Sequence, residues 1–342
     1  MINKILEIIY AKIFVNIIVN RSTTSVYVEV TNKNGIVDSK ESEFETITID
    51  ENMFNFIKSY IDNTPFFYIS ILDTSIDQGA VPTCTKIDMP KFYIPETSKH
   101  ICVEDKWAYY SSKYDLNKTE STYKDIGIDF IFSPFSVLSI FFADKINSNL
   151  SIFVLVQESY LSLAIFDNSA LLFAKHLDME HEDDDAEELL MGSNLDEDEE
   201  EEDFDLDDNV NLDDLDVDDD ISSLDDFGDI EDLGDMDDID EFSEDQEMDE
   251  LVEVEEKIIS TDTSTEGFNE DYQRYSLIQG AINSFYKDSK YESKFVETIY
   301  IADSVGVTSD LKRYLEEEMF LSVYVRRIDL GAEICEMAKA EI

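Results

Sequence analysis

Basic residues, cysteines and long apolar runs are all scarce in this 342-residue sequence, and each scarcity excludes a class of function. There are 25 Lys and Arg against 81 Asp and Glu, which gives a formal net charge of −56 at pH 7. Because nucleic-acid binding needs clustered basic side chains to neutralise phosphates, direct contact with DNA or RNA is not expected. The three cysteines form no CxxC pair, and their odd number suits a reducing cytosol and thiols without a redox role.

No apolar run reaches the length that crosses a bilayer. The Ile-rich stretch 2–19 is interrupted by Lys4, Glu7, Lys12 and Asn16, and no small-residue cleavage site follows it. It is therefore neither a spanning helix nor a signal peptide, and any membrane association is expected to be peripheral or through a partner.

Catalytic and metal-binding patterns are also missing. His100, His176 and His181 have no companions in a recognisable Ser/His/Asp arrangement. The acidic stretch contains no calcium-binding loop of the form D-x-D-x-D-G-x5-E, so weak binding of cations by a solvated polyanion is expected there instead. We therefore expect no metal site and no catalytic residues.

Most of the negative charge lies in one stretch. Residues 178–256 include 43 Asp and Glu and no Lys or Arg. Their acids alternate with single apolar residues, a composition that buries too little apolar surface to offset chain entropy. We predict a disordered acidic insert at 178–262, and its scattered apolar residues favour folding on a partner.

The remaining sequence predicts an α/β protein. Strand-length apolar runs separated by short polar turns predict one three-stranded meander within 13–48 and a second within 152–177, each followed by helical spacing. Asp50 is the expected cap of a helix at 51–62, and Ser133 and Pro134 open another. Residues 73–125, broken by three prolines, give a small subdomain whose layout does not follow from the sequence.

We divide the chain accordingly. Residues 1–177 form a first lobe, a small subdomain at about 50–125 and the start of a second lobe. The acidic insert occupies 178–262, and 263–342 completes the second lobe with alternating helices and strands.

Three segments resemble the PilM family of type IV pilus assembly proteins and the related GspL proteins of type II secretion. They are IIVNRSTTSVYVEV at 17–30, IFVLVQESYLSLAIFDNSALLFAKHL at 152–177 and IYIADSVGVTSDLKRYL at 299–315. The helix SPFSVLSIFF at 133–142 adds to the resemblance. The resemblance implies an actin-like ATPase fold, related to ribonuclease H, with two lobes.

The nucleotide site of that fold is degenerate in this chain. Each hairpin turn of a nucleotide-binding member carries an Asp, which positions magnesium or water, and a Gly, which lets backbone N–H groups approach phosphate. Asn20 and Ser22 stand at these places in the first turn, and Leu155 and Gln157 in the second. Only Gly306 remains of the glycine run in the adenosine loop. Asn20, Ser22, Thr23, Gln157 and Gly306 are the candidate remnants of a nucleotide pocket, with a plain hairpin turn as the alternative for the first three.

The resemblance therefore implies a non-catalytic cytoplasmic scaffold of a pilus, secretion or DNA-uptake machine, without a cofactor. Its expected partners are the cytoplasmic tail of a membrane-anchored, PilN-like protein and the assembly ATPase, which would bring it peripherally to the inner membrane. The absence of a membrane helix after the domain is the PilM rather than the GspL arrangement. Two alternatives stay open: a nucleotide-binding relative, either a kinase or an FtsA-like filament former, and an acidic chaperone or mimic that works through its insert.

Overall fold

The computed structural model describes residues 10–62, 64–179, 264–289, 291 and 294–342, with only the backbone described at 264–269. All of these residues belong to one compact unit. The acidic insert predicted at 178–262 lies outside the described residues, apart from Asp178 and Met179.

The first sheet has the strand order β3-β2-β1-β4-β8. Its strands are β1 (Lys12–Val19), β2 (Thr24–Asn32), β3 (Gly35–Phe44), β4 (Phe67–Leu72) and β8 (Phe130–Phe132). β1, β2 and β3 form the predicted antiparallel meander, whereas β4 runs parallel to β1 and β8 parallel to β4. β1 is the central strand of this sheet, and six of its eight residues are buried. Residues that point to both faces of the sheet are therefore mostly apolar.

The second sheet repeats this order as β11-β10-β9-β12-β13. Its strands are β9 (Ser151–Val156), β10 (Tyr160–Asp167), β11 (Ala170–Asp178), β12 (Thr298–Asp303) and β13 (Ser322–Arg327). β9, β10 and β11 are antiparallel, and β12 and β13 continue the sheet in parallel. The tight turn between β10 and β11 places Asn168 and Ser169 at positive φ, as a two-residue hairpin requires.

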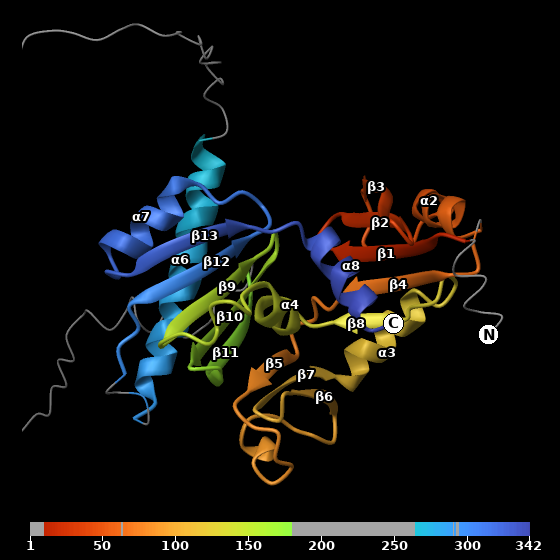
Figure 1. The fold of residues 1–342 in the computed structure, drawn as a ribbon. Coiled ribbons are helices and arrows are strands. Elements are labelled where there is room, and N and C mark those ends of the chain that lie inside the picture. Colours follow the sequence, from red (N-terminus) through yellow and green to blue (C-terminus); the bar gives the residue numbers. More distant parts are fainter. Residues whose placement is uncertain (1–9, 63, 180–263, 290, 292–293) are drawn as a thin grey trace, which may run out of the picture. The chain divides into compact units, whose positions relative to one another are not determined.

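Two five-stranded sheets that each consist of an antiparallel meander and two parallel strands, joined by helical crossovers, define the actin-like ATPase fold. The expected fold class, a ribonuclease H-like pair of lobes, is therefore confirmed. Figure 1 shows both sheets with their helices.

Six helices are described: α2 (Glu51–Ile61), α3 (Lys113–Thr122), α4 (Pro134–Phe141), α6 (Ser264–Lys287), α7 (Ser309–Glu317) and α8 (Leu330–Ala340). The predicted caps are confirmed, since the Asp50 carboxylate accepts the Met53 N–H at 2.7 Å and the Ser133 hydroxyl accepts the Phe135 N–H at 3.3 Å. α6 packs on β10 and β11, and α7 on β13 (Figure 1). No helix within the described ranges is long and apolar enough to cross a membrane.

The last helix, α8, was not predicted and belongs to the first sheet. After β13 ends in the second sheet, α8 packs against β1, β2 and β4. Gly331 permits this approach, because a Cβ there would lie 2.6 Å from the Tyr27 ring. Lys339 on this helix pairs with the buried Glu29 of β2.

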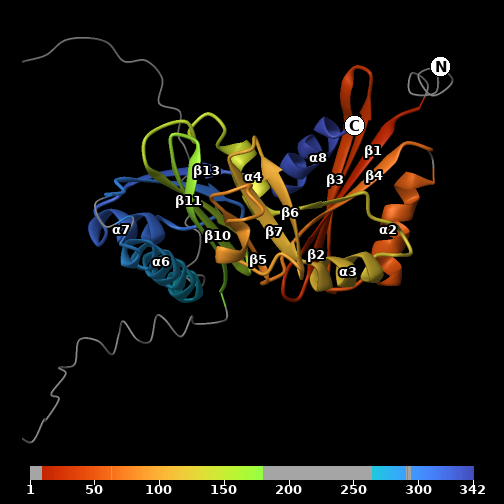
Figure 2. The ribbon, with the colours of Figure 1, turned by 90° about the horizontal axis from the view of Figure 1, so that it is seen from below.

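The small subdomain has a three-stranded sheet with the order β5-β7-β6 (Figure 2). Its strands are β5 (Gln78–Val81), β6 (Ser98–Val103) and β7 (Trp107–Ser112). The Tyr93 ring stacks on Tyr110 with 4.1 Å between centroids, and Trp107 packs edge-on against Phe166 of β10. Aromatic packing therefore fixes this subdomain, whose strands are too short to show a clear sequence period.

Candidate functional site

The two hairpin turns that face phosphates in nucleotide-binding relatives touch one another directly. The backbone N–H of Arg21, in the β1–β2 turn, donates to the hydroxyl oxygen of Ser159, in the β9–β10 turn, at 3.3 Å. The Arg21 guanidinium also reaches Asp178 at the end of β11, with 2.9 Å between Nη2 and Oδ1. The Arg21 N–H and guanidinium are thus committed to the second sheet.

The loop after β12 holds an internal anion where the adenosine loop of relatives approaches its ligand. Oδ1 of Asp303 accepts the backbone N–H groups of Val305, Gly306 and Val307 at 3.1, 2.7 and 3.1 Å. Its Oδ2 accepts from Nη1 of Arg327 at 2.9 Å. The donors that such a loop offers to an anion are therefore occupied by the chain itself.

The electrostatics of this loop follow from those contacts. Burial raises the pKa of Asp303, but the Arg327 guanidinium and the three N–H groups outweigh it and leave the pKa below its ordinary value. Gly306 has a φ of +91°, and a Cβ there would lie 2.9 Å from Nη1 of Arg327. The single remaining glycine of the loop thus makes room for the Asp303–Arg327 pair.

A second buried carboxylate closes the neighbouring helix terminus. Asp271 of α6 is fully buried and accepts from Nη1 of Arg274 at 2.7 Å. Its Oδ2 also accepts the N–H and hydroxyl of Thr308, the residue that caps α7, at 2.9 and 2.5 Å. The N-terminus of α7 is therefore satisfied from within the chain.

The pocket between the turns, which we call the interlobe pocket, is acidic. It has a volume of about 860 Å³ and includes Asn20, Gln157, Ser304 and Val305 in its lining. Its charged lining residues are Glu41, Glu43, Glu158, Glu270, Asp329, Arg274 and Arg327. Both arginines are already paired with carboxylates, so the remaining acids set the sign of the potential. Burial raises the pKa of Glu41, and Asp329 and Glu43 add to the effect.

A magnesium nucleotide does not fit this lining. A triphosphate needs cations and free N–H donors, whereas the acids would repel it and the loop donors are taken. Within the described residues, no group of three or more His, Cys, Asp and Glu side chains is arranged to hold a metal ion.

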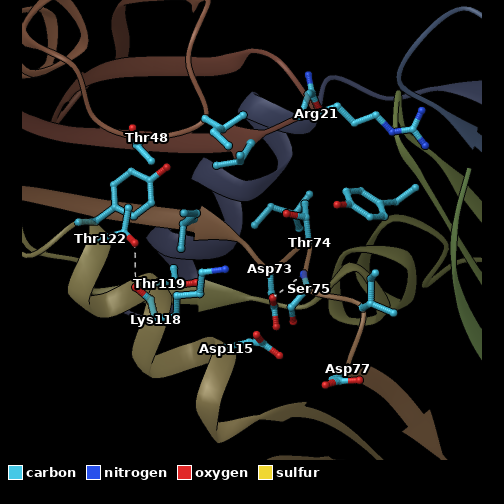
Figure 3. Close-up of a pocket in the computed structure, with 18 residues that line it drawn as sticks. Arg21, Thr48, Asp73, Thr74, Ser75, Asp77, Asp115, Lys118, Thr119 and Thr122 are labelled. Atoms are coloured by element: carbon cyan, nitrogen blue, oxygen red, sulfur yellow. Dashed lines mark hydrogen bonds between the residues drawn. The ribbon is translucent and has the colours of Figure 1, made fainter. Parts of the chain in front are cut away.

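A second pocket, of about 820 Å³, lies at the carboxyl ends of β1 and β4, and we call it the β4 pocket (Figure 3). Asp73, directly after β4, points toward Asp115 on α3 in this view. Asp77 and Lys118 also line the pocket. Carboxyl ends of parallel strands are a common place for ligands in α/β folds.

A third cavity, of about 630 Å³, is a groove between the small subdomain and the first sheet. We call it the β6–β8 groove. His100 and Ile101 of β6 line it, as do Ile131 of β8 and Leu116 of α3. Among the described strands, β6 pairs only with β7, and β8 only with β4, so each leaves one sheet edge unpaired.

The structure brings two of the predicted site residues together. Asn20 and Gln157 line the interlobe pocket, whereas Ser22, Thr23 and Gly306 are not part of that lining. The Asn20 N–H donates to the Thr23 carbonyl at 2.9 Å, which closes a tight turn. Gln157 is 2% exposed, and neither atom of its side-chain amide has a partner among the described residues. Whether these residues contact a nucleotide stays a prediction.

Sequence reasoning missed Arg21, Asp73, Asp271 and Arg327 as site residues. A partial signal exists for Asp73, because an Asp that directly follows a buried parallel strand lies at the ligand-binding edge of a sheet. Arg21 and Arg327 contact residues 157 and 24 positions away in the chain, and no local pattern marks such pairs.

Family models match both halves of the chain. A family described as Domain of unknown function (DUF8341) matches residues 152–342, and one described as Domain of unknown function (DUF8569) matches residues 10–139. No curated protein matches the sequence.

Solved structures with detectable similarity include three that span most of the chain. A Bacteroides thetaiotaomicron protein with an actin-like ATPase fold and unknown function is 9% identical, with 97% of this chain and 96% of that chain covered and a TM-score of 0.47. A PilM–PilN type IV pilus biogenesis complex is 11% identical, with coverages of 91% and 87% and a TM-score of 0.46. A Listeria monocytogenes putative N-acetylmannosamine kinase is 11% identical, with coverages of 96% and 99% and a TM-score of 0.37.

Proposed function

The chain belongs to the family described as Domain of unknown function (DUF8341), and we propose that this member is a non-catalytic scaffold that binds an extended segment of a partner protein. The observation that carries the proposal is the direct contact of the two hairpin turns through Arg21. With the turns joined and the loop after β12 filled by Asp303, the fold keeps its two lobes but offers a nucleotide no phosphate cradle.

The β6–β8 groove is the proposed docking site. The unpaired edges of β6 and β8 present backbone N–H and C=O groups to which an extended segment can add by strand pairing. Ile101, 55% exposed on β6, offers an apolar contact, while Lys99 and Glu120 form an ion pair at the rim with 3.9 Å between Nζ and Oε1. These features suit a segment of alternating apolar and charged residues.

The motif resemblance described above supports the finer part of the proposal. It favours the cytoplasmic tail of a membrane-anchored, PilN-like protein as the segment, and hence a peripheral place at the inner membrane in a pilus, secretion or DNA-uptake machine. The assembly ATPase of that machine is the second partner the resemblance implies. A nucleotide-binding kinase or filament former is disfavoured by the acidic interlobe pocket.

Site-specific photo-crosslinking in cells tests the docking site. A photoreactive residue is placed at Ile101, with Val37 as the matched control, an equally exposed apolar position on β3. We expect the Ile101 probe to capture the tail of a membrane-anchored protein, identified by mass spectrometry, and the Val37 probe not to capture it.

A synthetic peptide of the identified tail then binds the purified chain with micromolar affinity, and Ile101→Asp weakens this binding at least tenfold, because it places a charge in the apolar part of the groove. Equal capture from Val37, or peptide binding that Ile101→Asp leaves unchanged, would contradict the proposal.

A further inference from the structure

The β4 pocket contains a buried carboxylate oxygen with nothing to bind. Asp73 is 6% exposed, and its Oδ1 accepts the Ser75 N–H at 3.0 Å. Its Oδ2 is buried and has no hydrogen-bond partner in the part of the chain that the structure describes. Because an unpartnered buried charge is costly, such an oxygen points to a missing donor.

The second sheet shows which donor belongs at this place. Asp303 ends β12, the strand that corresponds in order to β4, and its Oδ2 pairs with Arg327. In the register of β12 and β13, Asp303 lies opposite Arg327. The two halves of the fold thus place an Asp at the same strand end, and the second half supplies it with a guanidinium.

The first half has no arginine at the corresponding place, although Lys118 of α3 lines the same pocket. The register of β4 and β8 pairs Leu72 with Phe132, so Ser133 stands where the second half has its arginine. The Ser133 hydroxyl is already engaged, with the Phe135 N–H and with Gln78. Among the described residues, no Lys or Arg forms an ion pair with Asp73 or Asp115.

The surroundings of Asp73 reinforce the demand for a positive charge. Asp77 and Asp115 line the same pocket. The lining contains two cations, Arg21, which is paired with Asp178, and Lys118, so the acids remain in excess. Figure 3 shows the Asp73 side chain pointing toward Asp115. Two further lining residues, Ser75 and Tyr123, have buried hydroxyl groups without a partner among the described residues.

We propose that the β4 pocket binds a guanidinium or primary ammonium group carried on an aliphatic chain. The cation lies between Asp73 and Asp115. It pairs with the Asp73 carboxylate as Arg327 pairs with Asp303, once a rotation of the Asp73 side chain exposes the buried Oδ2. Ile47, Ile71 and Leu72 provide apolar lining for the aliphatic chain, and a pocket of about 820 Å³ is large enough for a small organic ligand. A metal ion is less well matched to the pocket, since the described residues offer no cluster of three or more metal-binding side chains.

This site shares Asp73 with the β6–β8 groove, because that residue lines both cavities. The test therefore uses small cations and no partner protein. The probes are agmatine, a free alkylguanidine, and Nα-acetylarginine N-methylamide, which imitates an arginine side chain of another protein. Magnesium chloride is the metal probe.

The full-length chain is titrated by calorimetry as wild type, Asp73→Asn and Asp38→Asn. Asp38 is an exposed residue of β3, so the two variants lose the same charge and keep the same acidic stretch, which binds cations without specificity. We expect wild type and Asp38→Asn to bind a guanidinium probe alike, and Asp73→Asn to bind it at least tenfold more weakly. If only agmatine binds, the natural ligand is a free small molecule. If both probes bind, the natural ligand is an arginine side chain of another protein.

A melting experiment separates a ligand site from a structural role. Asp73→Asn removes an unpaired buried charge, so without a probe the variant should melt at or above the wild-type temperature. Equal affinity of the two variants for both probes would overturn the proposal, as would a lower melting temperature of unliganded Asp73→Asn. Magnesium binding that only Asp73→Asn abolishes would overturn it in favour of a metal site.

Discussion

Asp73 and Asp303 occupy the same place in the two halves of the fold, yet only one of them is neutralised. Asp303 accepts three backbone N–H groups and the Arg327 guanidinium. Asp73 accepts one N–H group, and its buried Oδ2 has no partner among the residues that the structure describes. Another buried carboxylate of the second half, Asp271 of α6, is also paired internally. It accepts hydrogen bonds from Arg274, Thr308 and Leu311. The second half has thus closed its strand ends with its own side chains, while the first half has left them open.

The difference teaches where ligands can bind in a fold with two similar halves. A duplicated topology provides two equivalent strand edges, and side-chain chemistry decides which edge stays available. In this chain the Asp at the strand end of the second half is paired internally, and both proposed sites, the β6–β8 groove and the β4 pocket, involve the first half.

The largest expected loss of stability comes from removing the buried Asp271 carboxylate in the second half. Asp271→Ala leaves Arg274, itself 4% exposed, buried without its main partner, and it removes the carboxylate that accepts hydrogen bonds from Thr308 and Leu311 at the start of α7. Breaking a buried ion pair in this way typically costs about 3–5 kcal/mol, which urea denaturation would measure. The double variant Asp271→Ala with Arg274→Met should recover part of the loss, and a double variant no more stable than the single one would contradict the account.

A second difference is acid sensitivity, which His176 on β11 gives to the second sheet. Burial lowers the pKa of His176 to about 4, despite the opposing effect of Asp178, and its Nε2 has no partner among the described residues. Since the unfolded state takes up the proton near pH 6.5, stability is full above that pH and falls as the pH drops toward 4. Because His176 is partly exposed, we expect the free energy of unfolding to fall by about 2 kcal/mol between pH 6.5 and pH 4.

The predicted acid sensitivity is checked by measuring the denaturation midpoints of the wild type and of His176→Gln between pH 4 and pH 7. Gln keeps a polar group near Ser162 and does not titrate, so the variant should show a shallower decline over that window. Parallel pH profiles of the two proteins would show that His176 does not carry the effect.

Removing Arg327 makes the second half resemble the first. Arg327→Ala leaves Oδ2 of the buried Asp303 without its cation, at a cost of about 1–2 kcal/mol, reduced because the arginine side chain is 68% exposed. Agmatine should restore part of the lost stability in a melting experiment, because it can occupy the vacated place. The lysine variant, Arg327→Lys, is the control that keeps the charge and should lose less.

The smallest expected effect concerns the acids of the interlobe pocket. Burial, Asp329 and Glu43 raise the pKa of Glu41, so its charged form costs stability as the pH rises through that pKa. Glu41→Gln should therefore stabilise the chain at pH 7. The gain should be only about a few tenths of a kcal/mol, because Glu41 is exposed and solvent screens its interactions. Glu45→Gln, on an exposed residue just beyond β3, is the comparison, and an equal gain there would point to overall net charge instead.

Local patterns predicted the elements whose signals are contiguous in the chain. The alternation of Val26, Val28 and Val30 and the turn at 32–35 predicted the first meander, and Asp50 predicted the start of α2, all of which the structure confirms. The order of the two meanders led to the actin-like fold. α8 was missed although Asp329 caps it and Leu330, Ile334 and Ala338 share one face, because its packing partner is β1, more than 300 residues earlier.

The candidate site was less accessible to sequence reasoning. The loss of Asp and Gly at Asn20, Ser22 and Gln157 was readable, because those residue types have a defined task in the turns. The groups that occupy the vacated space were not, since the Arg21–Ser159 contact and the Asp303–Arg327 pair depend on how strands 138 and 24 positions apart come together. A sequence shows which donors are missing, but only the fold shows which residues replace them.

Calorimetric titration of magnesium ATP into the full-length chain tests the central claim, that groups of the chain itself, from both halves, occupy the nucleotide site. The account predicts no saturable heat up to millimolar ATP for the wild type. Binding with micromolar affinity would contradict it, because it would require Arg21 and Asp303 to give up their internal partners to phosphate.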